Sequence, residues 1–250
     1  MKIELSINSQ SVETSGITKD YREAICEYIW NGFEANATKV MVDFVYNEIY
    51  GITEVIISDN GDGIKYETIS DTFGTFLASQ KNILSLQLKS KANKGKGRFS
   101  CFSFASNAQW TTTVLSSKEY VTYSISINSV NKTECEISEP VRTYGSKGTV
   151  LKITGIDTLK VSDVSFDALE ESMLKAFAWY FYLNMSKKLS LSINGHEFDY
   201  TKYIDTENSI TKTIDVEAEN FTIALIVWAK KIKESYCSYY LDATGSLCGK

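Results

Sequence analysis

The spacing of apolar side chains predicts two long amphipathic helices. Between residues 18 and 35, apolar positions recur every three to four residues, which is the period of a helix that buries one face. Thr18 is expected to cap this helix, with Asp20 in the first turn, where the helix dipole favours an acid. The second helix is expected over residues 165 to 184. Both helices need a partner surface for their apolar faces.

Short β-branched runs bounded by turn residues predict that this surface is a sheet. Short helices are expected near residues 67–73 and, after a glycine turn, within 95–105. Strands are expected at 2–8, 40–46, 53–58, 109–115, 120–128, 133–138, 148–154, 221–229 and 236–241, with a hairpin over 188–198 that turns at Asn194-Gly195. The pattern predicts an α+β fold, a two-layer sandwich with helices packed on one face of a mainly antiparallel mixed sheet.

Composition and charge narrow the class of protein. The 250 residues have an ordinary globular composition, which fits one domain or one plus a partial second. The net charge of −5 is spread along the chain without a run of like charges, so DNA binding is not indicated. The 5 cysteines are scattered and form no CxxC, which argues against a disulfide framework and a zinc site. The longest apolar run, residues 176–183, is too short to cross a membrane. We therefore expect a cytoplasmic protein.

The first predicted helix carries three polar residues along one edge. Glu27, Asn31 and Glu34 are spaced i, i+4, i+7, which places them close together beside the apolar stripe. A carboxylate can accept a proton from an attacking water, and an amide oxygen is a hard ligand suited to Mg²⁺. Taken alone, the same pattern fits a solvated helix face.

A glycine-rich turn follows the third predicted strand at Asp59-Asn-Gly61-Asp-Gly63. Its glycines allow the backbone to come close to a flat ligand or to adopt positive φ. Asp59, at the strand end, could accept a hydrogen bond from an exocyclic amine in an apolar pocket. An ordinary turn explains this segment equally well when it is taken alone.

Two further glycine segments complete the candidate chemistry. Lys94-Gly95-Lys96-Gly97-Arg98 precedes a helical stretch and offers backbone N–H groups of the kind that hold phosphates. It is neither a GxxxxGK[ST] loop nor a GxGxxG after a strand, which excludes those two nucleotide-binding classes. Gly148-Thr149 opens a later strand, and the threonine hydroxyl could reach a buried base.

Together and in this order, the four segments resemble the motifs of the Bergerat-fold (GHKL) ATPases, which include gyrase, heat-shock chaperones, MutL-type repair proteins, MORC-type ATPases and histidine kinases. The similarity is greatest to the MutL, MORC and chaperone branch. The family motif ExxxNxxDA reads here as Glu27-Tyr-Ile-Trp-Asn31-Gly-Phe-Glu34-Ala35, with Glu34 in place of the aspartate. The motif DxGxG is complete. Ala92 stands where many relatives have a glycine.

The resemblance implies ATP and Mg²⁺ as ligands and assigns a role to each position. Glu27 would be the general base, Asn31 the Mg²⁺ ligand, Asp59 the carboxylate that reads adenine, and Thr149 its supporting partner. The remaining nucleotide-binding positions would be Glu34, Gly61, Gly63, Lys94, Gly95, Lys96, Gly97 and Arg98. Residues from about 74 to 93 would form a lid over the nucleotide.

The expected function is a slow ATPase that acts as a conformational switch. The chain is expected to comprise an ATP-binding domain at 1–187 and a partial transducer-like region at 188–250, as part of a longer protein or an ATP-dependent homodimer. No lysine after residue 188 can be assigned to the γ-phosphate, so intrinsic hydrolysis should be slow. An interaction module that binds nucleotide without hydrolysis is the alternative. A histidine kinase is disfavoured, because the one histidine, His196, falls in a predicted hairpin.

Overall fold

The main sheet of the protein brings together strands from most of the chain. The computed structural model describes residues 2–4, 18–49, 51–70, 97–132, 134–216, 219–229, 239–240 and 247–249. The strands of this sheet are β1 (Lys2–Glu4), β2 (Lys39–Asn47), β3 (Gly51–Asp59), β4 (Ala105–Ser116), β5 (Glu119–Asn128), β6 (Glu134–Ile137), β7 (Val141–Arg142), β8 (Gly148–Ile156), β9 (Ser190–Ile193) and β10 (His196–Glu197). Their order is β1-β6-β5-β4-β8-β3-β2-β9-β10, with β7 paired to β5.

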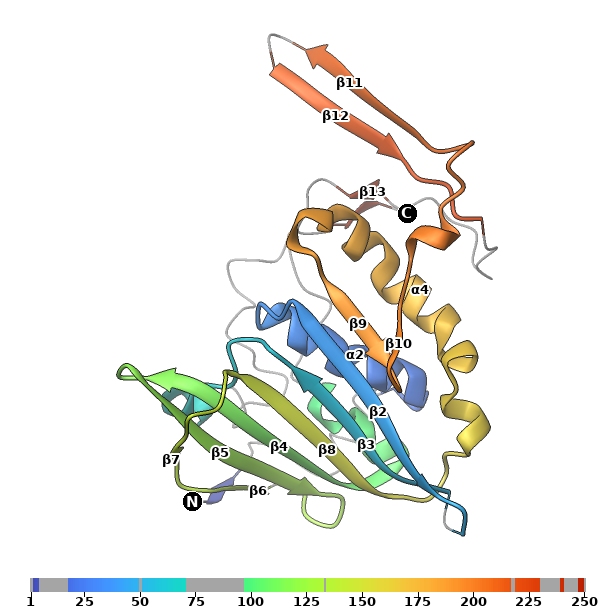
Figure 1. Ribbon diagram of the computed structural model, residues 1–250. Helices are drawn as coiled ribbons and strands as arrows, with labels where there is room; N and C mark the ends of the chain where they lie inside the picture. Colours follow the sequence, from blue (N-terminus) through green and yellow to red (C-terminus); the bar gives the residue numbers. More distant parts are fainter. Residues whose placement is uncertain are drawn as a thin grey trace.

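The sheet is mixed and mainly antiparallel, as predicted. Within the described part of the chain, β2 and β9 form its one parallel pair. In β4, Ala108, Trp110, Thr112 and Val114 are buried, and every second residue between them points away from the core. This period of two is typical of a sheet that is covered on one face only. The covered face looks toward the helices (Figure 1).

In the described part of the chain, two α-helices cover that face, α2 (Tyr21–Glu34) and α4 (Phe166–Leu183). They pack through aromatic side chains: Trp30 lies 5.0 Å from Phe177, and Phe33 lies 5.5 Å from Phe181, between ring centroids. Such pairs stabilise by roughly 0.5–1.5 kcal/mol beyond the area they bury. The apolar stripes predicted from the sequence thus meet each other as well as the sheet.

The cap of α2 differs from the prediction. Asp20, and not Thr18, is the N-cap, since its carboxylate accepts the backbone N–H of Arg22 at 2.8 Å. Thr18 lies outside the helix, where its hydroxyl accepts the N–H of Asp20 at 3.1 Å and donates to Glu23 at 2.6 Å. The prediction was wrong because two capping residue types occur two positions apart, and the one beside the first helical residue reaches the free N–H groups.

The segment after residue 97 is also tighter than predicted. Instead of a buried α-helix it forms the 3₁₀ helix η3 (Gly97–Ser103), and β4 begins directly after it. Its residues 98–101 are buried, so the prediction of burial is confirmed. The other 3₁₀ helices among the described residues are η1 (Tyr66–Thr68), η4 (Val161–Val164), η5 (Met185–Lys187) and η6 (Thr201–Tyr203). The predicted lid, residues 74–93, lies outside the described residues.

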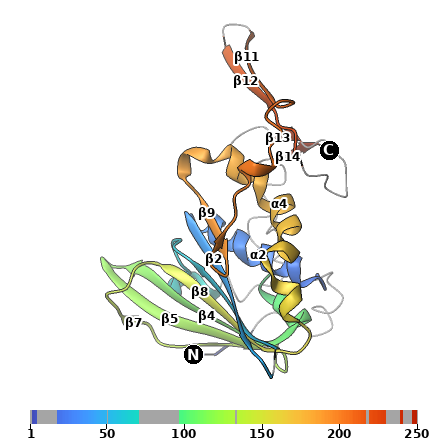
Figure 2. The same ribbon diagram turned by 45° about the vertical axis from the view of Figure 1, so that its right-hand side comes forward.

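The last part of the chain forms two small sheets. β11 (Ile210–Val216) pairs with β12 (Glu219–Leu225) in a hairpin that extends away from the main sheet in both views (Figure 2), and β13 (Tyr239–Tyr240) pairs with β14 (Leu247–Gly249). β11 was not predicted from the sequence pattern. The predicted hairpin at 188–198 is confirmed, with Asn194 and Gly195 both at positive φ, and its first strand, β9, pairs with β2. The division into two domains remains a prediction.

Candidate functional site

The outer edge of α2 presents the three polar residues of the first motif. Glu27 is half-buried, whereas Asn31 and Glu34 are exposed at the boundary between the core and the solvent. Glu34 lies toward α4, where its charge adds to burial in raising the pKa of Tyr180. The helix therefore presents a carboxylate and an amide one turn apart, with the second carboxylate turned toward its neighbour helix.

Tyr28, the neighbour of Glu27, fixes η3 against α2. Its buried hydroxyl donates to the carbonyl oxygen of Arg98 at 3.2 Å and accepts the N–H of Cys101 at 3.0 Å. As a result Gly97 faces Glu27: a Cβ placed on Gly97 would lie 3.2 Å from the Glu27 carboxylate. The structure thus brings the first and third motifs into contact.

The basic residues of the third motif are only partly described. Lys94, Gly95 and Lys96 lie outside the described residues. The Arg98 side chain is buried, with its guanidinium 5.3 Å above the Phe99 ring, and burial lowers its pKa to about 10. It is therefore still a cation at neutral pH, and it lies within the core at the start of η3.

Asp59 ends β3 at the centre of the sheet, directly opposite Thr149 of β8. One carboxylate oxygen accepts the N–H of Gly61 at 2.7 Å. Burial raises the pKa of Asp59, while the N–H groups of Gly61 and Thr149 act in the opposite direction. The carboxylate is thus oriented by the backbone and poorly solvated.

Three glycines from three segments surround Asp59. A Cβ on Gly32 of α2 would lie 3.1 Å from the Asp59 Cβ, and one on Gly61 would lie 2.9 Å from its carboxylate. At Gly148 of β8, where φ is +141°, a Cβ would lie 2.1 Å from the Asp59 carbonyl oxygen. Side chains at these positions would fill the surroundings of the carboxylate. The glycines therefore keep the chain close to Asp59 without covering it.

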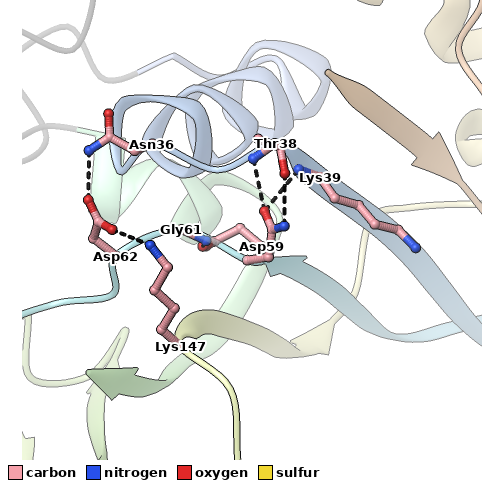
Figure 3. Close-up of polar contacts among 8 residues, drawn as sticks. Asn36, Thr38, Lys39, Asp59, Gly61, Asp62 and Lys147 are labelled. Atoms are coloured by element: carbon pink, nitrogen blue, oxygen red, sulfur yellow. Dashed lines mark hydrogen bonds and ion pairs between the residues drawn. The ribbon is translucent and has the colours of Figure 1, made fainter. Parts of the chain in front are cut away.

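A network of polar contacts ties the turn after β3 to the end of α2 (Figure 3). The Asn60 side-chain oxygen accepts the N–H groups of Thr38 and Lys39, both at 2.9 Å. Asp62 accepts from the Asn36 side chain at 2.6 Å and pairs with Lys147 at 2.5 Å. Three segments around Asp59 are thus linked at their exposed rim.

The second motif is also held from the opposite side. Gly63 has a φ of +73°, and a Cβ there would lie 2.7 Å from the Thr113 carbonyl oxygen. The N–H of Ile64 donates to the Thr112 hydroxyl at 2.9 Å, and its carbonyl oxygen accepts from the Tyr123 hydroxyl at 2.5 Å. The turn is therefore fixed at both ends.

Several residues of this site were not found from the sequence. Gly32 could have been noticed, since glycine within a helix is destabilising by about 0.5–1 kcal/mol relative to alanine and calls for a reason. Thr112 carries no such signal, because a threonine is ordinary in a strand. The ion pair of Asp62 with Lys147 joins positions far apart in the sequence. Only the fold reveals the last two.

Among the residues that the structure describes, no group of three or more acidic, cysteine or histidine side chains could hold a metal ion. An exposed amide such as Asn31 can be one ligand of a Mg²⁺ ion that takes its other ligands from phosphates and water.

Among the residues that the structure describes, none of the helices has the length and apolar character of a membrane span.

One comparison with known proteins agrees with the motif pattern. A family model described as "Histidine kinase-, DNA gyrase B-, and HSP90-like ATPase" matches residues 19–158. A search of curated proteins found no match. Among solved structures, the N-terminal domain of a DNA repair protein is similar with a TM-score of 0.44 and 20% identity, over 74% of this chain and 51% of that one. The chain thus spans about half the length of that structure.

Proposed function

The chain belongs to the family of histidine kinase-, DNA gyrase B- and HSP90-like ATPases, since the family model matches more than half of it, and on this premise we propose that it is a slow, Mg²⁺-dependent ATPase that acts as a conformational switch. Membership of the family implies ATP binding. Hydrolysis, the lid and the switch are the proposed part.

The observation that carries the proposal is the convergence of the motifs on two neighbouring places. Asp59 is surrounded by Gly32, Gly61 and Gly148, and Glu27 lies against Gly97. Both places adjoin α2, the first at Gly32 and the second at Glu27. In the proposed complex, the flat base lies beside the glycines. The phosphates lie beside Glu27.

Asp59 is suited to reading an amine. Burial removes water that would otherwise donate hydrogen bonds to this carboxylate. An N–H donor from a ligand can take the place of that water. The exocyclic amine of adenine is such a donor, and guanine presents a carbonyl oxygen at the same place. We therefore expect a preference for adenine nucleotides.

Glu27 is suited to the hydrolytic step. It is half-buried and next to Gly97, and in the proposed reaction it takes the proton of the attacking water. Asn31, one helical turn further on, would hold Mg²⁺, which when bound neutralises charge on the phosphates. Phosphate contacts are assigned to Lys94, Gly95, Lys96, Gly97 and the backbone of Arg98, and Glu34 remains a proposed nucleotide-binding position.

The switch itself involves the lid predicted at residues 74–93. In the proposal, this segment closes over bound nucleotide, and closure changes the contacts of a second copy or of a following domain. Because the cation that stabilises the γ-phosphate is not assigned within this chain, turnover in isolation is expected below about 1 s⁻¹, under a typical enzyme rate.

Replacing Glu27 tests the proposal. We expect Glu27→Ala to bind ATP as the parent does and to lose about 100-fold or more in turnover, because a general base contributes roughly 10²–10⁴-fold. Glu23→Ala, which removes the same charge one turn earlier on the same helix, is the control and should hydrolyse normally.

The measurements are phosphate release and the dissociation constant for ATP and Mg²⁺. Unchanged turnover in Glu27→Ala would show that the base is assigned wrongly. A parent that binds ATP and releases no phosphate would instead identify a nucleotide-binding module that does not hydrolyse ATP.

A further inference from the structure

A row of four side chains crosses the sheet beneath the candidate base pocket. Asp59 on β3 faces Thr149 on β8, Thr149 faces Thr112 on β4, and Thr112 faces Tyr123 on β5. Directly opposed residues of antiparallel strands point to the same face of a sheet, with their Cβ atoms about 4.5–5.5 Å apart. The row therefore lies on the helix-covered face, and it begins at the carboxylate proposed to read adenine.

Thr112 is the fully buried member at the centre of this row. Its hydroxyl accepts the N–H of Ile64 at 2.9 Å, and it lies 3.2 Å from the Thr149 hydroxyl and 3.4 Å from the Gly148 carbonyl oxygen. One oxygen thus contacts both the end of the second motif and the start of the fourth. Nothing in the four sequence motifs includes this residue.

The hydrogen count at Thr112 limits what Thr149 can do. A hydroxyl has one hydrogen and two lone pairs, and one lone pair of Thr112 is used by Ile64. If Thr112 donates its hydrogen to the Gly148 carbonyl oxygen, the Thr149 hydroxyl donates its own hydrogen to Thr112. The Thr149 oxygen can then only accept a hydrogen bond from a ligand in the pocket. If Thr112 donates its hydrogen to Thr149, the nearer partner, the Thr149 hydrogen is left to point into the pocket.

We propose that Thr112 is a positioning residue that donates to Thr149 and so makes the Thr149 hydroxyl a donor toward the bound base. This inference rests on the proposed ATP binding. The pocket then offers an acceptor, Asp59, beside a donor, Thr149. Adenine has the complementary pair, an amine donor next to the acceptor nitrogen N1, and buried donor–acceptor pairs discriminate strongly because a mismatch leaves a polar group unpaired.

The test compares ATP with 1-deaza-ATP, in which a C–H group replaces N1. We expect the parent to prefer ATP, and Thr112→Val, which leaves the Thr149 O–H free to rotate among its staggered positions, to reduce that preference by about threefold. Thr112→Ser keeps the hydroxyl and should retain the parent preference. Thermal unfolding of each variant without nucleotide shows that it is folded.

Tyr123→Phe is the matched control, because it removes the other side chain that holds Ile64 without contacting Thr149. It should leave the preference unchanged. The proposal is overturned if Thr112→Val keeps the parent preference, if Tyr123→Phe loses it equally, or if the parent binds both nucleotides alike. A parent that binds neither nucleotide would refute the proposed function itself, which is a distinguishable result.

Discussion

The base side and the phosphate side of the candidate site are built from different kinds of structure. The base side, made of Asp59, Gly148, Thr149 and Thr112, sits on three adjacent strands whose register sets every neighbour. The phosphate side, made of Glu27, Asn31 and Gly97, sits on a helix edge and the start of a 3₁₀ helix. The first is buried or half-buried, and the second opens outward to an exposed amide. In the proposed function, the base side is therefore preformed, and the phosphate side is completed by the phosphates and Mg²⁺.

The largest effect is expected on the base side, from Gly148→Ala. The new Cβ would lie 2.1 Å from the Asp59 carbonyl oxygen at a φ of +141°, so a strand must move. We expect a loss of unfolding free energy on the order of 3 kcal/mol, together with loss of ATP binding. Urea unfolding with and without ATP measures both effects.

Gly195→Ala provides the control for this substitution. Gly195 also has a positive φ, +77°, but nothing lies within 4 Å of its missing Cβ. Only backbone strain remains, so a loss of about 1 kcal/mol is expected, with ATP binding intact. Equal losses of unfolding free energy in the two variants would show that the close contact of residue 148 with Asp59 does not affect stability.

An intermediate effect is expected on the phosphate side, from Asn31→Ala. Asn31 is exposed, so its removal should leave stability within about 0.5 kcal/mol of the parent. If its amide holds Mg²⁺, the Mg²⁺ concentration needed for ATP binding should rise about tenfold, while adenosine, which has no phosphates, should bind as before. Titration calorimetry at several Mg²⁺ concentrations would measure the binding of ATP and of adenosine. Equal weakening for both ligands would contradict the role of Asn31 as a Mg²⁺ ligand.

The smallest effect concerns the pH dependence of Asp59 without nucleotide. Burial raises its pKa in the folded state above 3.8, so the folded protein binds this proton more tightly than the unfolded chain. Ionisation of Asp59 therefore reduces stability as the pH rises through the interval from 3.8 to the raised value. Asp59→Asn should equal the parent in stability below that interval and exceed it slightly at neutral pH. A parent that is more stable than Asp59→Asn at neutral pH would contradict this account.

Much of the fold could be predicted from periodicity, because the apolar patterns are strong where elements are buried on one side. α2, α4 and the hairpin of β9 and β10 were predicted within a few residues. The N-cap at Asp20 was missed, because Thr18 and Asp20 can both serve as caps. β11 was missed as well, because Lys212 interrupts the apolar face formed by Ile210, Ile214 and Val216 and weakens the alternation.

The candidate site was predicted where its chemistry lies within one short segment. Glu27 and Asn31 share a helix, and Asp59 and Gly61 share a turn, so spacing alone brings each pair together. Thr112 becomes part of the site only through the register of β4 and β8. The buried position of Arg98 depends on how η3 packs and could not be foreseen from a basic, glycine-rich pattern.

The most direct test of the central claim is thermal unfolding with and without a non-hydrolysable ATP analogue and Mg²⁺, on the parent and on Asp59→Asn. Ligand at about 100 times its dissociation constant adds roughly 2.7 kcal/mol, a shift on the order of 5–10 °C for a chain of this size. We expect this shift in the parent and its loss in Asp59→Asn, which should itself be folded. No shift in the parent, or the same shift in both proteins, would contradict the claim that Asp59 reads the base of a bound ATP.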